Sequence, residues 1–198
     1  MQTGSIGAEG ASTAGIDEAP ARRPLWRADT RSLVGSALMG VFMVLLVGLG
    51  DRIDASVSGG AFPVFGGTAW AITMALSALF FGLPGALIAG EIQALMDIAF
   101  GVPLAPAFII ANAAGPLIFA LVAARLPMRT WLHYLLALLP SVIVGNLIVS
   151  AYLAIYMQVP VSMLVVSTLV VIAVGIVAAL IVVPAIARKV WRSRLLDM

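Results

Sequence analysis

The sequence contains no cysteine, a single histidine and a single lysine among its 198 residues. Without cysteine the chain forms no disulfide, no thiolate nucleophile and no cysteine-ligated metal site. One imidazole cannot form a histidine cluster, and Lys189 does not belong to a G-x-x-x-x-G-K-[ST] phosphate-binding loop. We therefore expect no metal or cofactor site and no ATP-driven motor within this chain.

Charged residues are also scarce, at 10% of the chain, whereas 62% of the residues are apolar. Soluble domains carry about 25% charged residues, because most of their surface faces water. The composition therefore excludes a soluble fold and indicates that lipid surrounds most of the chain. Beyond residue 32 the apolar sequence is long enough for about six spans of roughly 20 residues each. We expect an all-α integral membrane protein with a bundle of six transmembrane helices.

Breaks in the hydropathy set the bounds of the six expected spans. The second and third spans are separated only by Gly82, Leu83 and Pro84, so they should form a tight helical hairpin with Pro84 in a first turn. A disordered tail (1–32) and a basic tail (188–198) are expected to flank the membrane domain (33–187). The expected spans are Leu33–Gly50, Phe62–Phe81, Leu83–Phe100, Leu104–Ala124, Trp131–Met157 and Val161–Ala187.

The basic residues predict the orientation of these spans. With six spans, both tails and the 125–130 loop lie on one side, and that side holds every Lys and Arg of the 11 except Arg52. Because Lys and Arg near span ends stay in the cytoplasm, both termini should be cytoplasmic in a cell membrane. The outward connection Asp51–Ala61, rich in glycine and serine, is expected to be either a mobile lid or a solvated linker.

Two acidic residues, Glu91 and Asp97, are the only ionisable residues inside the expected spans. Charges at this depth survive only where they face protein or water. Gln93 and Asp97 share a helical face, whereas Glu91 lies about 120° away from Asp97. Glu91 is therefore either a structural carboxyl bonded to a neighbouring helix or a ligand contact.

Other polar and aromatic side chains are expected at similar depth in the remaining spans. Singly, each is typical of an interhelical hydrogen bond or an interfacial aromatic residue. Together with the two acids they predict an outward-facing cavity that suits a small ring-containing solute, preferably a cation. The candidate substrate-binding residues are Trp70, Glu91, Gln93, Asp97, Asn112, Asn146, Tyr152 and Tyr156.

Small residues also mark a helix-packing face in the first span, where Ser36 and Gly40 lie at i and i+4. Such a face allows close approach of another helix, either a partner protein's helix or one of the chain's own.

His133 lies at the start of the fifth expected span beside Trp131 and Tyr134, where an interfacial residue is expected. It has no nucleophile nearby in the sequence, so we expect no catalytic site.

The segments ALMGVF and GLPGALIAGEIQALMDIAFG, with six spans in under 200 residues, make the region 31–187 resemble the substrate-binding S components of energy-coupling-factor vitamin transporters. The resemblance implies a six-helix bundle with an outward pocket, and a first helix that meets the transmembrane coupling subunit through a small-residue motif. That motif falls here on Ser36 and Gly40, with Ser and Gly where alanines are usual. Pro84, Glu91 and Asp97 belong to the segment that is most similar to the branch for thiamine or its hydroxymethylpyrimidine precursor.

The sequence thus predicts a vitamin-binding subunit that relies on a transmembrane coupling subunit and ABC-type ATPases for energy. Glu91 and Asp97 would polarise the ligand, Trp70 and a tyrosine would stack on it, and two asparagines would orient it. A structural or assembly subunit of a membrane complex is an alternative, in which the intramembrane acids bond to partner helices. A further alternative is an intramembrane enzyme acting on lipid, with Glu91 or Asp97 as acid-base group.

Overall fold

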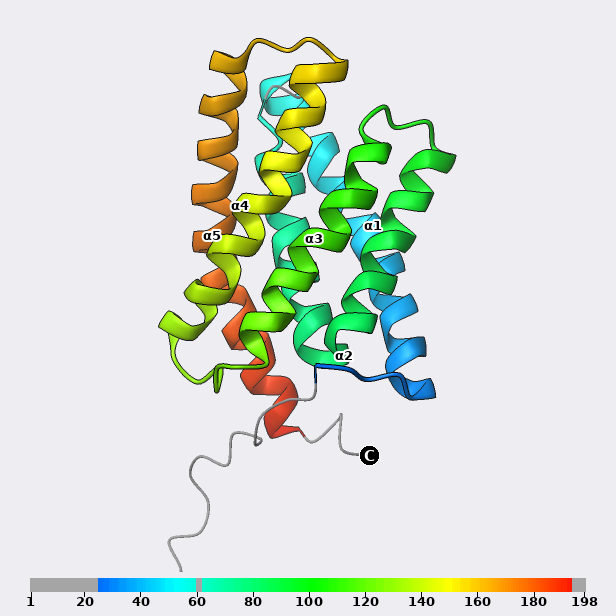
Figure 1. The fold of residues 1–198 in the computed structure, drawn as a ribbon, viewed down its shortest axis with the longest axis vertical. Helices are drawn as coiled ribbons and strands as arrows, with labels where there is room; N and C mark the ends of the chain where they lie inside the picture. Colours follow the sequence, from blue (N-terminus) through cyan, green and yellow to red (C-terminus); the bar gives the residue numbers. More distant parts are fainter. Residues whose placement is uncertain (1–24, 60–61, 194–198) are drawn as a thin grey trace, which may run out of the picture.

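The computed structural model describes residues 25–59 and 62–193, and every element in these ranges is an α-helix. All five are long and apolar enough to cross a membrane, which confirms an all-α chain with the character of a multi-pass membrane protein. Figure 1 shows the helices packed side by side in one bundle. The helices are α1 (Thr30–Ser58), α2 (Val64–Ala99), α3 (Ala105–Ala123), α4 (Trp131–Tyr156) and α5 (Val161–Arg192).

The chain reverses direction within α2, at Gly82. This residue has φ 71° and ψ −166°, which is not helical. A straight helix would separate Gly66 from Gln93 by roughly 40 Å at 1.5 Å per residue, yet both line the same cavity. The segments 64–81 and 83–99 therefore run back alongside each other (Figure 1). The predicted break lies at the right place, and Pro84 lies in the first turn of the second segment, where its missing N–H is tolerated.

The segment that precedes α1 packs against this reversal. The backbone N–H of Leu83 donates to the carbonyl of Leu25 at 2.9 Å, and the Arg27 guanidinium donates to the carbonyl of Phe80 at 3.4 Å. A Cβ on Gly82 would lie 2.8 Å from the Leu25 carbonyl oxygen, so only glycine permits this approach. The predicted tail is thus too long: residues 25–32 are ordered, and 1–24 lie outside the described residues.

Helix α1 begins at Thr30 because Asp29 caps it. The Asp29 carboxylate accepts the Ser32 backbone N–H at 2.9 Å and the Ser32 hydroxyl at 2.8 Å. These two hydrogen bonds lower the pKa of Asp29 below its ordinary value of 3.8. The cap satisfies a backbone donor that the first helical turn leaves without a partner.

At its other end α1 continues past the apolar run to Ser58 and stops at Gly59, which is left-handed with φ 63°. The predicted outward loop Asp51–Ala61 is therefore wrong for residues 51–58, which are helical and form no lid. Similarly, α5 continues to Arg192, into the predicted C-terminal tail. The polar turns of α1 are held by the Asp54 hydrogen bonds described below, and the extra turns of α5 pack Val190 and Trp191 against the core.

Helix α2 forms the centre of the bundle. In its most apolar stretch 72% of residues are buried, against 22–44% in the other helices. Its inner face consists largely of alanine and other small residues, so neighbouring helices approach closely, which is how helices associate where lipid removes the hydrophobic driving force. Larger side chains fill the remaining space, among them Phe119, Tyr134 and Leu138, each at most 2% exposed.

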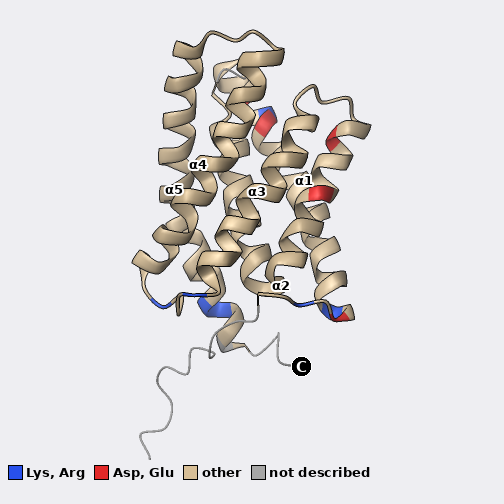
Figure 2. Ribbon diagram, viewed as in Figure 1, with Lys and Arg blue, Asp and Glu red and all other residues tan. Residues whose placement is uncertain are grey.

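The two ends of the bundle differ in their content of basic residues. Figure 2 shows most Lys and Arg at the end where Gly82 and the described ends of the chain lie. The opposite end holds the α1–α2 connection and Arg52. Along the chain, the basic residues of the Gly82 end flank the start of α1, lie in the α3–α4 connection and follow near the end of α5: Arg27, Arg31, Arg125, Arg129, Arg188 and Lys189.

Candidate functional site

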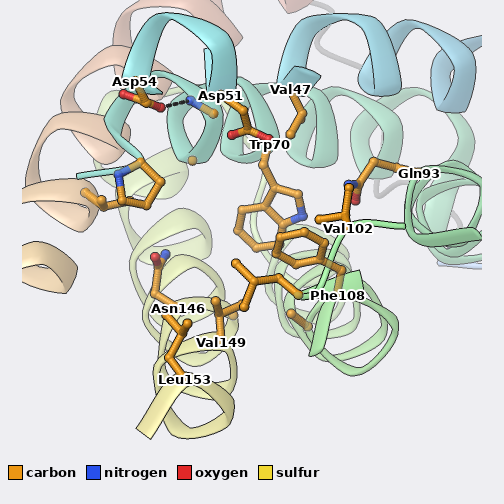
Figure 3. Close-up of a pocket in the computed structure, with 17 residues that line it drawn as sticks. Val47, Asp51, Asp54, Trp70, Gln93, Val102, Phe108, Asn146, Val149 and Leu153 are labelled. Atoms are coloured by element: carbon orange, nitrogen blue, oxygen red, sulfur yellow. Dashed lines mark hydrogen bonds between the residues drawn. The ribbon is translucent and has the colours of Figure 1, made fainter. Parts of the chain in front are cut away.

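A cavity of about 260 Å³ opens at the end of the bundle opposite Gly82 (Figure 3). All five helices and the α2–α3 connection contribute to its wall, which is mainly apolar with a few polar groups, as is usual for small-molecule sites. The lining residues are Val47, Asp51, Asp54, Pro63, Gly66, Gly67, Trp70, Gln93, Val102, Leu104, Phe108, Ala111, Gly145, Asn146, Val149, Leu153 and Val171.

One wall is the corner where the end of α1 meets the start of α2. Asp54 is 4% exposed, and its carboxylate accepts the backbone N–H groups of Val64, Phe65 and Gly66 at 2.9–3.0 Å. These are N–H groups that the first turn of α2 cannot satisfy itself, and the helix dipole also stabilises an anion here. Gly50 permits the contact, since a Cβ there would lie 2.6 Å from the Gly66 nitrogen.

The Trp70 side chain forms the middle of the cavity wall. Its ring edge lies between Gly115 of α3 and Gly145 of α4, where added Cβ atoms would come within 2.9 and 2.6 Å of it. Two glycines thus make the slot that holds the indole between α3 and α4. Figure 3 shows Asp51 and Phe108 next to the indole, with Asn146 on the α4 side.

A chain of hydrogen bonds links Trp70 to Gln93, which both line the cavity, through Asn112 behind the wall. The indole N–H donates to the Asn112 side-chain oxygen at 2.6 Å, and the Asn112 amide donates to the Gln93 side-chain oxygen at 2.8 Å. The Gln93 amide in turn donates to the Asp97 carboxylate. Asn112 also donates to the carbonyl of Gly90 at 2.6 Å. The chain ends in an anion, which stabilises every donor in it, and it fixes both halves of α2 to α3.

The structure thus places the predicted site residues in three groups. Trp70, Gln93 and Asn146 line the cavity. Asn112, which is fully buried, and Asp97 lie behind the wall and hold Trp70 and Gln93. The predicted contacts Glu91, Tyr152 and Tyr156 are not part of the lining: Glu91 is half-buried, and the two tyrosine rings pack on each other with centroids 4.7 Å apart.

The small-residue face of α1 is used within the chain. Gly40 faces α2, where an added Cβ would lie 2.9 Å from Ile92 and 3.1 Å from the Ala89 carbonyl. Ser36 is fully buried, and its hydroxyl donates to the carbonyl of Ser32. Of the two predictions for this face, internal packing is the one that agrees with the structure.

Among the lining residues that were not predicted from the sequence, three have charged or aromatic side chains: Asp51, Asp54 and Phe108. The two aspartates were assigned to a loop because they follow the apolar run, although no helix breaker occurs between Gly50 and Ser58 and their spacing of three places them on one helical face. Phe108 carried no signal, because a phenylalanine in an apolar span is ordinary. His133, in contrast, accepts the backbone N–H of Thr130 at 3.4 Å at the start of α4.

The chemistry of the cavity suits binding. Its polar groups are carboxylates and amides, beside an indole and a phenyl ring. No Lys or Arg occurs among its lining residues, so the local charge is negative, and aromatic faces also attract cations. Within residues 25–59 and 62–193 no three His, Asp or Glu side chains are placed to share a metal ion.

Comparison of the chain with protein-family models, with curated proteins and with solved structures gave no match.

Proposed function

We propose that this chain is the membrane-embedded substrate-binding subunit of a transporter, of the energy-coupling-factor S-component type. It captures a small vitamin-like heterocycle, with thiamine or its pyrimidine precursor favoured, for ATP-driven uptake. The observation that carries the proposal is the 260 Å³ cavity that combines the Trp70 ring with a carboxylate and two amides. A flat, positively charged ring would satisfy these groups together, since the indole offers a stacking surface and the carboxylate a counter-charge.

The proposed arrangement in the cell membrane has six spans, with the two segments of α2 crossing separately. The chain reversal at Gly82 supports this count. The basic residues gathered at the Gly82 end favour a cytoplasmic position for that end and for both termini. The cavity then opens to the outside, where a solute is captured.

Energy would come from partner subunits, because the sequence lacks a phosphate-binding loop. A transmembrane coupling subunit and ABC-type ATPases are the partners that the resemblance implies. Since Ser36 and Gly40 pack against α2, the coupling subunit would meet a helix surface that stays exposed, such as the α1 face of Val34, Leu38 and Val41.

Binding to the purified full-length protein tests the proposal. Thiamine and 4-amino-5-hydroxymethyl-2-methylpyrimidine are titrated in detergent by calorimetry, and micromolar or tighter affinity is expected for one of them. Trp70→Leu should weaken that affinity about tenfold by removing the stacking surface. Trp131→Leu is the matched control, because Trp131 is 65% exposed at the start of α4 and should leave binding unchanged. If wild-type protein binds neither compound nor any other vitamin at micromolar concentration, the assignment is wrong.

A structural or assembly subunit is the second candidate, and Glu91 is the observation that favours it. This acid is half-buried, lies outside the cavity lining and makes no hydrogen bond to another described residue. A partner helix could supply the missing donor. Glu91→Gln tests this second candidate: loss of complex assembly favours the structural subunit, whereas unchanged assembly with unchanged solute binding favours the transporter, because Glu91 lies outside the cavity lining.

A further inference from the structure

Two aspartates of α1 line the cavity, but only one of them has its hydrogen-bonding capacity filled. Asp54 is 4% exposed and accepts three backbone N–H groups from the start of α2. Its charge is therefore compensated within the protein, by the donors and by the helix terminus. Asp54 fixes the corner between two helices and has little capacity left for a ligand.

Asp51 lies one helical turn earlier and differs in each of these respects. Its side chain is exposed, and it makes no hydrogen bond to another residue in the described ranges. The carboxylate lies against Gly66, where an added Cβ would collide with it, so the glycine leaves room for this placement. Figure 3 shows the carboxylate beside Trp70 at the cavity wall.

The charges around Asp51 are also negative. Asp54 on the same helix and Asp97 on the second segment of α2 are near enough for their charges to interact with it. The neighbouring Arg52 is exposed and does not line the cavity. Among the lining residues, therefore, no cationic side chain is available to pair with Asp51.

We propose that Asp51 is the specificity-determining residue of the cavity, and that it selects small planar organic cations over neutral molecules of the same shape. The ring of the ligand lies against Trp70 and Phe108, and its positive group pairs with the Asp51 carboxylate. Asp54, although it lines the same wall, has no part in this selection. The inference deepens the proposed binding function and rests on it, because it names the substrate class of that cavity.

The test uses a matched pair of probes, the cation 1-methylnicotinamide and neutral nicotinamide, which both quench tryptophan fluorescence. Trp26, Trp131 and Trp191 are replaced by Phe in the full chain, so that Trp70 alone reports. The cation should quench Trp70 about fivefold more strongly than the neutral probe, because it concentrates beside the carboxylate. Asp51→Asn should lower this ratio to the value that the two probes give with free N-acetyltryptophanamide, and it should leave quenching by nicotinamide unchanged within twofold.

Arg52→Gln and Asp54→Asn are the controls, each with its thermal unfolding midpoint recorded. Arg52→Gln should leave the ratio unchanged or slightly raised, and Asp54→Asn should lower the midpoint, which shows how loss of the corner between α1 and α2 affects stability. An unchanged ratio in Asp51→Asn overturns the inference, as does an equal fall of the ratio in Arg52→Gln. Because these probes need no cognate ligand, failure of thiamine or its precursor to bind is a separate result and contradicts the proposed function only.

Discussion

The two ends of the bundle are built from largely the same helices, yet one is closed and the other holds a cavity. Around Gly82, Leu25 and alanines of α2 and α3 leave a void of about 10 Å³, whereas the opposite end encloses about 260 Å³. Small residues abound at both ends, so side-chain size does not explain the difference. At the closed end the segment before α1 fills the space between the helices, and at the open end the Trp70 ring lies between α3 and α4 while Asp54 joins α1 to α2 around the cavity.

The polar contacts at the two ends have different structural roles. At the closed end they hold the irregular segment before α1 against the chain reversal at Gly82, through Leu25 and Arg27. At the open end they join helices around a space, through Asp54 and Asn112. Changing one contact at a time should therefore affect packing at the closed end and cavity shape at the open end.

Gly82→Ala should have the largest effect, because it breaks the closed end. The backbone of Gly82 lies in a region open essentially only to glycine, and the new Cβ would lie 2.8 Å from the Leu25 carbonyl. We expect a loss of about 3 kcal/mol in the free energy of unfolding. Gly59→Ala, at a left-handed position with open space around it, should cost about 1 kcal/mol. Thermal unfolding in detergent measures both, and equal losses would contradict the role of the Leu25 contact.

Asn112→Ala should have the next largest effect, at the open end. The variant removes hydrogen bonds to Trp70, Gln93 and Gly90 in a fully buried position. Because interhelical hydrogen bonds in membranes are worth about 0.6 kcal/mol each, and buried partners lose theirs as well, we expect a loss of about 2 kcal/mol. Asn146→Ala is the control: Asn146 donates only to Val142 on its own helix and should cost under about 1 kcal/mol.

Trp70 emission offers a second readout for the same pair. Freed from Asn112, the indole should move in its slot and its emission maximum should shift, whereas Asn146→Ala should leave the maximum in place. If both variants behave alike, the hydrogen-bond chain does not position Trp70.

Acidification should produce the smallest effect, at the cap of α1 beside the closed end. Because Ser32 lowers the pKa of Asp29 in the folded protein, the cap contributes stability above the ordinary pKa of 3.8. That contribution should be lost as the pH falls through the lowered folded value, since the protonated side chain is a weaker acceptor. Asp29→Ser retains a cap that does not titrate, so the difference in midpoint between the variant and wild type should narrow below about pH 4. A difference that stays constant from pH 6 to pH 3 would contradict this account.

Much of the fold could be predicted from the sequence, because lipid imposes a length and an apolar composition on each span. The bounds of α3 and α4 agree with prediction to within one residue, and the break in α2 lies at the predicted glycine. The end of α1 was wrong because Asp51 and Asp54 resemble the polar start of a loop. That turn stays helical because the Asp54 carboxylate accepts backbone N–H groups at the start of α2, beginning with Val64. A hydrogen-bond partner ten residues away does not appear in a hydropathy pattern.

The candidate site could be predicted only in part, for a related physical reason. Depth in the membrane follows from sequence position, so Trp70, Gln93 and Asn146 could be placed at one level. The direction in which each side chain points depends on the rotation of its helix and on the neighbouring helices. For this reason Glu91 does not line the cavity, whereas Asp51 does. The Asn112 contacts needed the pairing of α2 with α3, which a single sequence does not contain.

The composition of the cavity wall has a consequence for how the protein matures. Val47 comes from α1 and Val171 from α5, so the wall is incomplete until α5 has been synthesised and inserted. A nascent chain halted after α4 would already contain Trp70 and its asparagine partner, but it would lack one side of the chamber. The cavity therefore forms only after α5 has joined the bundle, and the proposed solute binding would begin at that point.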